Sequence, residues 1–452
     1  MRGEEGMERD MTVGKPGKII LNFTIPIFIG NIFQQLYSMV DTVIVGKFVG
    51  NEALAAVGSC GTLMFLILGF LMGLTAGFTV VTAQHFGAGN MRAMRQSVAS
   101  ASVLSAVISV LMTVLSMAFM KQILHLMHTP EDIYGEAYSY IMIICGGIVA
   151  QVLYNLLASI LRALGNSKIP LYFLILAALL NIVLDLVFII VFHLGAAGAA
   201  WATVISQGIS GILCLFYIVK AVPELHLKRE DWHMNWNLAG WQMKIGLPMA
   251  FQYSITAIGT IMVQTALNTL GSLAVASFAA ANKIEQLVTQ AYVAMGTTMA
   301  TYCAQNTGAK KIDRVRQGFR SATIMGSIYA VVTGAVLILG GKYLTILFVK
   351  DNLTQVMGMV DIYLRCVSIM FIPLLVVNVY RNGIQGMGFG LLPMMAGIAE
   401  LIGRGVMAII SGKIGSYTVA CMASPAAWIL AGGLLLVMYF YIMKKYERQK
   451  AK

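Results

Sequence analysis

Residues 26–50 read PIFIGNIFQQLYSMVDTVIVGKFVG, one hydrophobic segment that carries a seam of polar side chains. Asn31, Gln34, Ser38 and Asp41 recur at spacings of three and four, so a helix would place them on one face. The segment is long enough to cross a bilayer, which needs about 20 apolar residues. A charged side chain inside the membrane costs roughly 2.5–3.5 kcal/mol. The pattern therefore predicts that Asp41 handles an ion or a proton, unless its side chain is hydrated at the outer interface.

The composition of the whole chain is that of a membrane protein. Of its 452 residues, 58% are hydrophobic and 11% are charged, with a mean hydropathy of +0.80. Soluble proteins carry about 25% charged residues. We therefore predict an all-α polytopic membrane protein. Twelve apolar segments can be drawn, at residues 18–46, 52–83, 94–120, 134–161, 168–192, 196–221, 240–269, 273–304, 317–341, 354–380, 391–411 and 416–443.

The distribution of Lys and Arg predicts the topology. If the N-terminus is inside, 23 of these residues fall on the inner side and five on the outer side: Lys47, Lys121, Lys342, Lys350 and Lys413. Such an excess follows the positive-inside rule. We expect both termini to be cytoplasmic. This topology explains the net charge of +12, so we predict no nucleic-acid partner.

The chain repeats itself. QHFGA at 84–88 matches QNTGA at 305–309, and LRALG at 161–165 matches IQGMG at 384–388, at a nearly constant offset. Between the copies, a linker at 222–239 carries Trp232 and Trp236 among charged residues and is predicted to lie on the cytoplasmic membrane surface. We expect an N-terminal lobe at 1–221 and a C-terminal lobe at 240–452 with a basic tail. Six spans in each lobe would relate the lobes by an axis along the membrane normal.

Three motifs resemble the multidrug and toxic compound extrusion (MATE) family: QHFGAG at 84–89, LRALGNSKIP at 161–170 and GLP at 246–248. The resemblance covers nearly the whole chain. It implies the fold of that family and its wider MOP superfamily, a V-shaped bundle of twelve transmembrane helices in two pseudo-symmetric six-helix lobes. It also implies cation-coupled export of organic compounds.

Within that family the chain is similar to the branch named for the DNA-damage-inducible protein F, whose ionisable site lies in the N-terminal lobe. Asp41 matches the aspartate of helix 1 in that branch, Asn181 and Asp185 the pair of helix 5, and Thr203 the threonine of helix 6. The other bacterial branch has acidic residues in helices 7 and 10. Here those positions are Thr256 and Leu374, which argues against a coupling site of that kind.

These four residues form the predicted coupling site. Asn181 and Asp185 are four apart and share a helical face. With Asp41 and Thr203 they could offer oxygens to Na⁺ or hold a proton, and we expect no cofactor beyond that coupling ion. Two close carboxylates cannot both ionise cheaply, so the pair should hold one proton at neutral pH. The alternative is a structural hydrogen bond between Asp185 and Asn181.

Other polar residues could line a substrate cavity. In the N-terminal half these are Gln34, Tyr37, Tyr140 and Asn155, each of which could equally be a packing residue. The C-terminal half offers Gln252, Thr256 and Glu285. The pairs Asp361–Arg365 and Glu400–Arg404 are four apart and are predicted to be structural ion pairs. The sequence leaves the roles of Lys283 and Glu285 open.

Together these features predict a secondary active multidrug efflux transporter rather than an enzyme. It would exchange small organic cations outward for inward H⁺ or Na⁺ by alternating access, as a monomer in the bacterial plasma membrane. One alternative is a lipid-linked oligosaccharide flippase of the same superfamily, although the acidic N-terminal seam disfavours a pyrophosphate substrate. Another is a membrane-embedded polyprenyl transferase, but no Asp-x-x-x-Asp motif adjoins an apolar segment.

Overall fold

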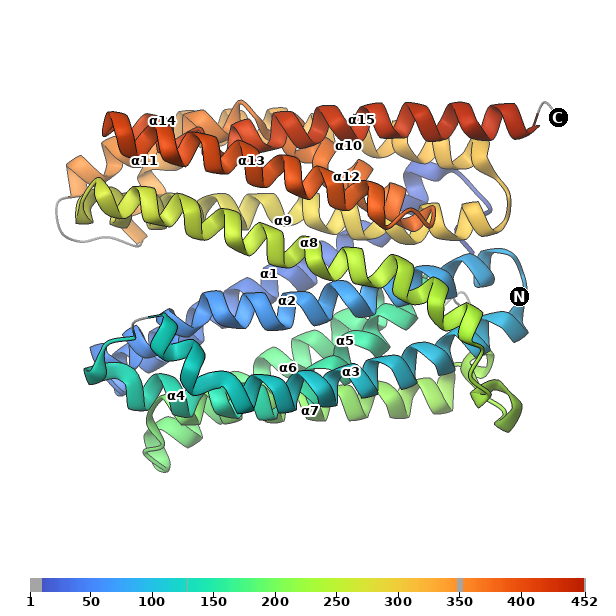
Figure 1. Ribbon diagram of the computed structural model, residues 1–452, viewed down its shortest axis with the longest axis horizontal. Helices are drawn as coiled ribbons and strands as arrows, with labels where there is room; N and C mark the ends of the chain where they lie inside the picture. The colour runs from blue at the N-terminus through green and yellow to red at the C-terminus, as the bar shows by residue number, and fades with distance from the viewer. Residues whose placement is uncertain (1–9, 128, 348–352, 451–452) are drawn as a thin grey trace. The chain divides into compact units, whose positions relative to one another are not determined.

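The computed structural model describes residues 10–127, 129–347 and 353–450, and these residues form helices and no strand (Figure 1). The predicted all-α class is confirmed. Of the charges counted for topology, Arg2, Arg9, Lys350 and Lys452 lie outside the described residues. The α-helices are α1 Pro16–Phe48, α2 Asn51–Gly87, α3 Met91–Leu126, α4 Glu131–Gly146, α5 Ile148–Ala163, α6 Lys168–Leu186, α7 Gly195–Ala221, α8 Trp236–Thr269, α9 Ser272–Gly308, α10 Ile312–Gly340, α11 Leu353–Ser368, α12 Phe371–Gly386, α13 Leu391–Ile414, α14 Tyr417–Cys421 and α15 Ala423–Lys450.

Each of the twelve predicted segments coincides with a long helix or with a bent pair of helices. Within the described part of the chain, nine helices are long and apolar enough to cross a membrane, and two bent pairs raise the number to eleven. The remaining predicted segment, 273–304, coincides with α9, which is 37 residues long. Its hydropathy is lower because it carries polar side chains, among them Asn282, Lys283 and Glu285.

Two segments predicted as continuous helices are in fact broken. The segment at 134–161 bends by 48° between α4 and α5, and the segment at 354–380 bends by 51° between α11 and α12. At the first break, a Cβ on Gly147 would lie 2.2 Å from Cγ2 of Val204 on α7, so no side chain fits there. At the second, Pro373 is the third residue of α12 and has no N–H to continue the ladder from α11.

The sequence repeat is also a repeat of helices and turns. Helices α2 and α9 are both 37 residues long, and α5 and α12 are both 16 residues long. The turns agree as well, since Gly50 and Gly271 both have positive φ, at 123° and 98°, and so do Gly165 and Gly388, at 88° and 95°. Glycine adopts this conformation without the steric cost that a side chain would bring. The matched glycines therefore set equivalent helix boundaries in the two halves.

The contacts divide the chain into two compact units. The N-unit comprises Asp10 and Ile29–Tyr253, and the C-unit comprises Met11–Phe28 and the described residues from Ser254 onward. Both boundaries fall inside long helices, α1 and α8, so the first half of each helix packs with one unit and the second half with the other. The functional assignment of lobes at 1–221 and 240–452 stays a prediction.

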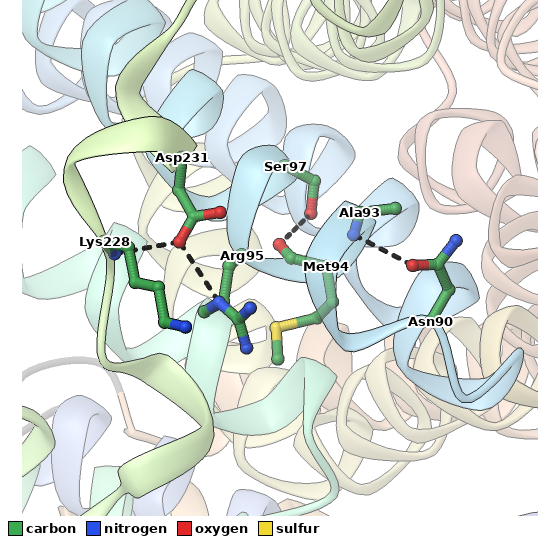
Figure 2. Close-up of polar contacts among 7 residues, drawn as sticks. All are labelled: Asn90, Ala93, Met94, Arg95, Ser97, Lys228 and Asp231. Atoms are coloured by element: carbon green, nitrogen blue, oxygen red, sulfur yellow. Dashed lines mark hydrogen bonds and ion pairs between the residues drawn. The ribbon is translucent and has the colours of Figure 1, made fainter.

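A partly buried ion pair ties the linker between the halves to α3 within the N-unit (Figure 2). It contains two short 3₁₀ turns, η2 Pro223–Leu225 and η3 Arg229–Trp232. Asp231 is buried, pairs with Arg95 of α3 at 3.1 Å and accepts the backbone N–H of Lys228 at 2.8 Å. Trp232 and Trp236 remain exposed, at 50% and 79%, as an interfacial connector would require.

Candidate functional site

Helix α6 carries two buried polar side chains on an otherwise apolar helix. Asp185 is 0% exposed and Asn181 is 2% exposed. The helix ends at Leu186 and continues as a π-helical turn, η1, over Val187–Val191. Such wide turns are rare and often mark functional sites. Asn181 and Asp185 are therefore both buried on α6, as a pair on one face requires, and the π-helical turn η1 follows them directly.

Asp185 meets Asp41 of α1. The two carboxyl groups lie close enough to act on each other electrostatically. Among the described residues, no N–H or O–H donor reaches Oδ1 of Asp41 or either carboxyl oxygen of Asp185, and these atoms are buried. A carboxylate has no proton to donate, so a hydrogen bond between two carboxyl groups requires a proton on one of them. The pair is thus arranged to hold a proton or another cation.

Asn181 and Thr203 lie beside this carboxyl pair. Nδ2 of Asn181 donates to Oγ1 of Thr203 on α7 over 3.4 Å. The other amide atom, Oδ1 of Asn181, is buried without a donor among the described residues. An amide oxygen in this setting can accept from a protonated carboxyl group or bind a small cation. The structure therefore shows two contacts within the predicted site, Asp41 with Asp185 and Asn181 with Thr203, and their role in coupling stays a prediction.

Two tyrosines border the carboxyl pair. The hydroxyl of Tyr37 on α1 lies close to the side chains of Gln34 and of Gln207 on α7, and it interacts electrostatically with Asp41. Tyr140 of α4 is 4% exposed and close enough to interact electrostatically with both carboxyl groups. Tyr37, Gln34 and Tyr140 thus belong to the same cluster as the pair.

Gln207 was missed in the sequence analysis. It is 8% exposed, and its Oε1 has no donor among the described groups. It follows Thr203 by four residues, so both side chains lie on one face of α7. The four-residue spacing between Thr203 and Gln207 could have indicated in the sequence that Gln207 lies on the same helical face.

The other residues predicted to line a cavity lie elsewhere. Asn155 of α5 is half-buried and donates to the backbone oxygen of Gln151, one turn earlier, over 2.9 Å. Gln252 belongs to the N-unit part of α8. Thr256 and Glu285 belong to the C-unit, where the backbone oxygen of Thr256 accepts the hydroxyl of Thr260 at 3.1 Å. A role of these residues in a cavity stays a prediction.

The donor set fits a proton or a small hard cation better than a transition metal. It consists of two carboxyl groups, one amide oxygen and one hydroxyl, which are ligands that alkali and alkaline-earth ions accept. The described residues contain no group of three or more His, Cys, Asp or Glu side chains that could hold a metal ion. Transition-metal sites usually recruit imidazole or thiolate ligands.

The comparisons with known proteins identify the family. The family model described as MatE matches residues 26–187 and 245–422, which is most of the chain. This chain belongs to the MATE family. Among MATE relatives, the "Probable multidrug resistance protein YpnP" of Bacillus subtilis (strain 168) is 30% identical over 384 residues, or 83% of either chain.

A more distant relative in the same organism, the "Probable multidrug resistance protein YoeA", is 29% identical over 305 residues and 66% of either chain. Among solved structures, the outward-facing conformation of a multidrug resistance MATE family transporter matches with a TM-score of 0.92, 21% identity and 99% coverage of both chains. That likeness confirms the MATE fold. The relatives are named as multidrug resistance proteins, and these names do not favour the oligosaccharide flippase alternative.

Proposed function

We propose that this MATE-family multidrug transporter is a secondary active exporter that exchanges small organic cations for inward H⁺ or Na⁺. The observation that carries the proposal is the contact between Asp41 and Asp185. Among the described residues, neither Asp41 nor Asp185 forms an ion pair with a Lys or Arg side chain, so negative charge on the pair is available to a coupling ion or to a substrate. The similarity to the branch named for the DNA-damage-inducible protein F supports the same site.

The proposed coupling follows from competition for one pair of carboxyl groups. Two carboxylates in contact inside a membrane repel each other, so the pair holds one proton at neutral pH and one negative charge. That charge attracts an organic cation. A second proton, or Na⁺, removes the charge and releases the substrate. Because binding is reciprocal, the substrate in turn weakens binding of the coupling ion.

The membrane potential drives the exchange in the proposed orientation. With both termini in the bacterial cytoplasm, as the Lys and Arg distribution predicts, the coupling ion enters from outside. Each unit charge that moves inward releases about 2.3 kcal/mol per 100 mV. Asn181 and Thr203 would supply polar oxygens to whichever ion occupies the pair. We propose that one chain carries the complete cycle as a monomer.

Export from everted membrane vesicles tests this function. Vesicles containing the unaltered protein should accumulate a fluorescent organic cation such as ethidium when a proton or Na⁺ gradient is imposed. Asp185→Asn should abolish this uptake while the protein remains folded. Asp132→Asn is the matched control, because Asp132 is exposed at the start of α4. Imposing each gradient separately identifies the coupling ion, and uptake by Asp185→Asn at the unaltered rate would overturn the proposal.

A further inference from the structure

One end of the C-unit is strongly basic, and the proposed exchange at Asp41 and Asp185 does not use it. Three segments that are far apart in the sequence contribute to this end: residues 11–18, 310–320 and 441–448. Together they carry ten basic and two acidic side chains, a net charge of +8. Nine of the basic side chains are exposed and one is half-buried. The C-unit basic surface is defined by these ten residues: Lys15, Lys18, Lys310, Lys311, Arg314, Arg316, Arg320, Lys444, Lys445 and Arg448.

Hydrogen bonds hold the first segment against the turn between α9 and α10. Nη1 of Arg314 donates to the backbone oxygen of Gly14 over 2.8 Å, and Nη2 donates to that of Met11 over 3.1 Å. Nζ of Lys311 donates to the backbone oxygen of Thr12 over 3.1 Å. The side chain of Met11 is 1% exposed and belongs to the core of the unit. The two lysines of this segment are thereby fixed beside the start of α10.

An ion pair joins the third segment to the same turn. Nη2 of Arg316, near the start of α10, lies 2.6 Å from Oε1 of Glu447, near the end of α15. Figure 1 shows the turn between α9 and α10 and the end of α15 at the same end of the helices. The three segments therefore form one continuous surface.

Elsewhere in the C-unit, charged side chains are neutralised by internal ion pairs. Asp361 pairs with Arg365 at 2.8 Å, as the sequence predicted. Glu400 lies 3.6 Å from Arg404, its predicted partner, and closer to Arg381 of α12, at 2.5 Å. These pairs show how the fold compensates charges that have a structural role.

The charge of the C-unit basic surface is not compensated in this way. Among the described residues, Arg316 is the one member of the surface that forms an ion pair. Lys311 and Arg314 donate to backbone carbonyl oxygens, which carry no net charge. The bonds therefore fix the positions of these side chains and leave their positive charge in place.

The internal repeat shows that the fold of the turn does not require so many basic residues. Residues 88–99, the N-terminal counterpart of residues 310–320, form the same turn between two long helices with two basic residues, Arg92 and Arg95. The C-terminal turn has five. Its three additional basic residues stand where the N-terminal turn has alanine or glycine: Lys310, Lys311 and Arg320. Folding of the turn does not account for this excess, whereas binding of an anion does.

The apolar neighbours of the basic residues indicate a membrane surface rather than a soluble anion. Phe440 and Tyr441 are each 66% exposed on the apolar span Tyr417–Gln449, about one turn before Lys444. In the first segment, Val13 is 64% exposed two residues before Lys15. Exposed aromatic side chains followed by lysine are typical of the boundary between membrane and water. The basic side chains are thus expected at the depth of the lipid headgroups.

We propose that the C-unit basic surface binds the phosphate groups of anionic phospholipids. Lysine binds phosphate as a flexible point charge, and arginine binds it through paired N–H groups. The distribution of Lys and Arg predicts this end to be cytoplasmic, and the cytoplasmic leaflet carries the negative surface potential that attracts such clusters. The surface would repel the organic cations of the proposed exporter, so it is no entry site for them. This lipid binding goes beyond the exporter function and does not depend on it.

Lipid retention by the full-length protein tests the proposal. The protein is placed in nanodiscs with equal amounts of phosphatidylglycerol and phosphatidylcholine of the same acyl chains, and native mass spectrometry counts the lipids that it retains. Phosphatidylglycerol should be retained in excess. One lysine at an anionic membrane surface strengthens binding about fivefold, so Lys444→Gln/Lys445→Gln should lower the preference about fivefold to thirtyfold. Lys15→Gln/Lys18→Gln should have an effect of the same order.

The matched control is Lys342→Gln/Lys413→Gln, which removes the same charge from the end of the C-unit predicted to be outside. Lys342 directly follows α10, and Lys413 lies in the last turn of α13. This variant should retain the full preference for phosphatidylglycerol. An unaltered protein without that preference would overturn the proposal, as would an equal loss in the control.

Two further measurements distinguish the source of the phosphate and the effect of misfolding. Excess glycerol 3-phosphate should leave the retained phosphatidylglycerol in place, and displacement would assign the surface to a soluble anion instead. Phosphatidylglycerol should raise the thermal unfolding temperature of the unaltered protein in detergent more than that of either double variant. Because the two double variants alter different segments, each one that folds is a complete test. Failure of the exporter function would appear in ethidium uptake, which lipid retention does not measure.

Discussion

Nε of Arg95 on α3 lies 3.1 Å from Oδ2 of Asp231, which is 4% exposed and holds the linker against the N-unit (Figure 2). The same carboxyl oxygen accepts the N–H of Lys228, so one buried charge closes a 3₁₀ turn and ties it to a helix. Ion pairs of this kind matter most through the cost of breaking them, because the remaining charge stays buried.

Removing the arginine should therefore destabilise the protein. We expect Arg95→Gln to lower the free energy of unfolding by about 3–5 kcal/mol, and the additional change Asp231→Asn to recover part of that loss. The matched control is Arg316→Gln, which lies 221 residues after Arg95, at the offset of QHFGA and QNTGA. It removes an arginine from an exposed 2.6 Å pair with Glu447 and should cost about 1 kcal/mol or less. Thermal unfolding of the purified variants in detergent measures both effects. Equal losses in the two variants would contradict the buried-charge argument.

Position 147 should not tolerate a side chain, whereas the neighbouring position 146 should tolerate one. A Cβ at Gly147 would lie 2.2 Å from Val204, but a Cβ at Gly146 would meet nothing within 4 Å. We expect Gly147→Ala to destabilise the protein by about 1–3 kcal/mol through overpacking. Gly146→Ala, at the end of α4, should be neutral or stabilising by up to about 1 kcal/mol. Thermal unfolding of both variants measures these effects. An unchanged stability of Gly147→Ala would show that α5 and α7 do not pack this closely.

Substrate binding should weaken as the pH falls. Acid protonates the carboxyl pair of Asp41 and Asp185, removes its negative charge and so weakens attraction of an organic cation. Binding of ethidium to the purified protein, followed by fluorescence polarisation, should decrease between about pH 8 and pH 6. Asp41→Asn should weaken binding and flatten this dependence. Added Na⁺ at the higher pH should imitate acid if Na⁺ is the coupling ion, and indifference to both ions would exclude competition at this pair.

Thr203 should contribute less than the carboxyl groups. Thr203→Val removes the hydroxyl that accepts from Nδ2 of Asn181 and leaves a buried donor unpaired, at a cost of about 1–3 kcal/mol. We expect reduced ethidium export with the coupling retained. Thr203→Ser keeps the hydroxyl and is the matched control. A complete loss of export in Thr203→Val, with normal export in Thr203→Ser, would make the hydroxyl an essential ligand instead.

The predicted topology can be tested by labelling single cysteines. A cysteine at Lys121, which is exposed, should react with an impermeant maleimide from outside intact cells. A cysteine at Glu230 should react only after permeabilisation. Glu230 is preferable to its neighbour Asp231, which is buried and could not be labelled on either side. Labelling of position 230 from outside would reverse the proposed orientation.

The sequence predicted those parts of the molecule that depend on local spacing. The seam ending at Asp41 and the pair Asn181 and Asp185 follow from helical periodicity, and the helices follow from hydropathy. The role of Thr203 could be inferred only from the family resemblance, because its four-residue spacing to Gln207 indicates a shared helical face and not a coupling site. That it lies 3.4 Å from Asn181 is visible only in the structure.

The features that were missed depend on contacts between distant parts of the chain. Glu400 was predicted to pair with Arg404 in its own helix, yet its closer partner is Arg381, which lies on another helix, α12. The break at Gly147 is decided by Val204, which lies on α7, beyond α5 and α6 in the chain. A glycine inside an apolar run does not by itself distinguish a bend from a continuous helix.

The sharing of α1 and α8 between the units constrains the order in which this protein can assemble during synthesis. The N-unit lacks part of its packing until residues up to Tyr253 have been made, well past the linker. Met11–Phe28 are made before the linker but pack with residues from Ser254 onward. The first part of α1 must therefore wait for residues made after the linker before it can pack. Severing the gene at the linker would give two fragments, each missing the opening half-helix that the other one carries.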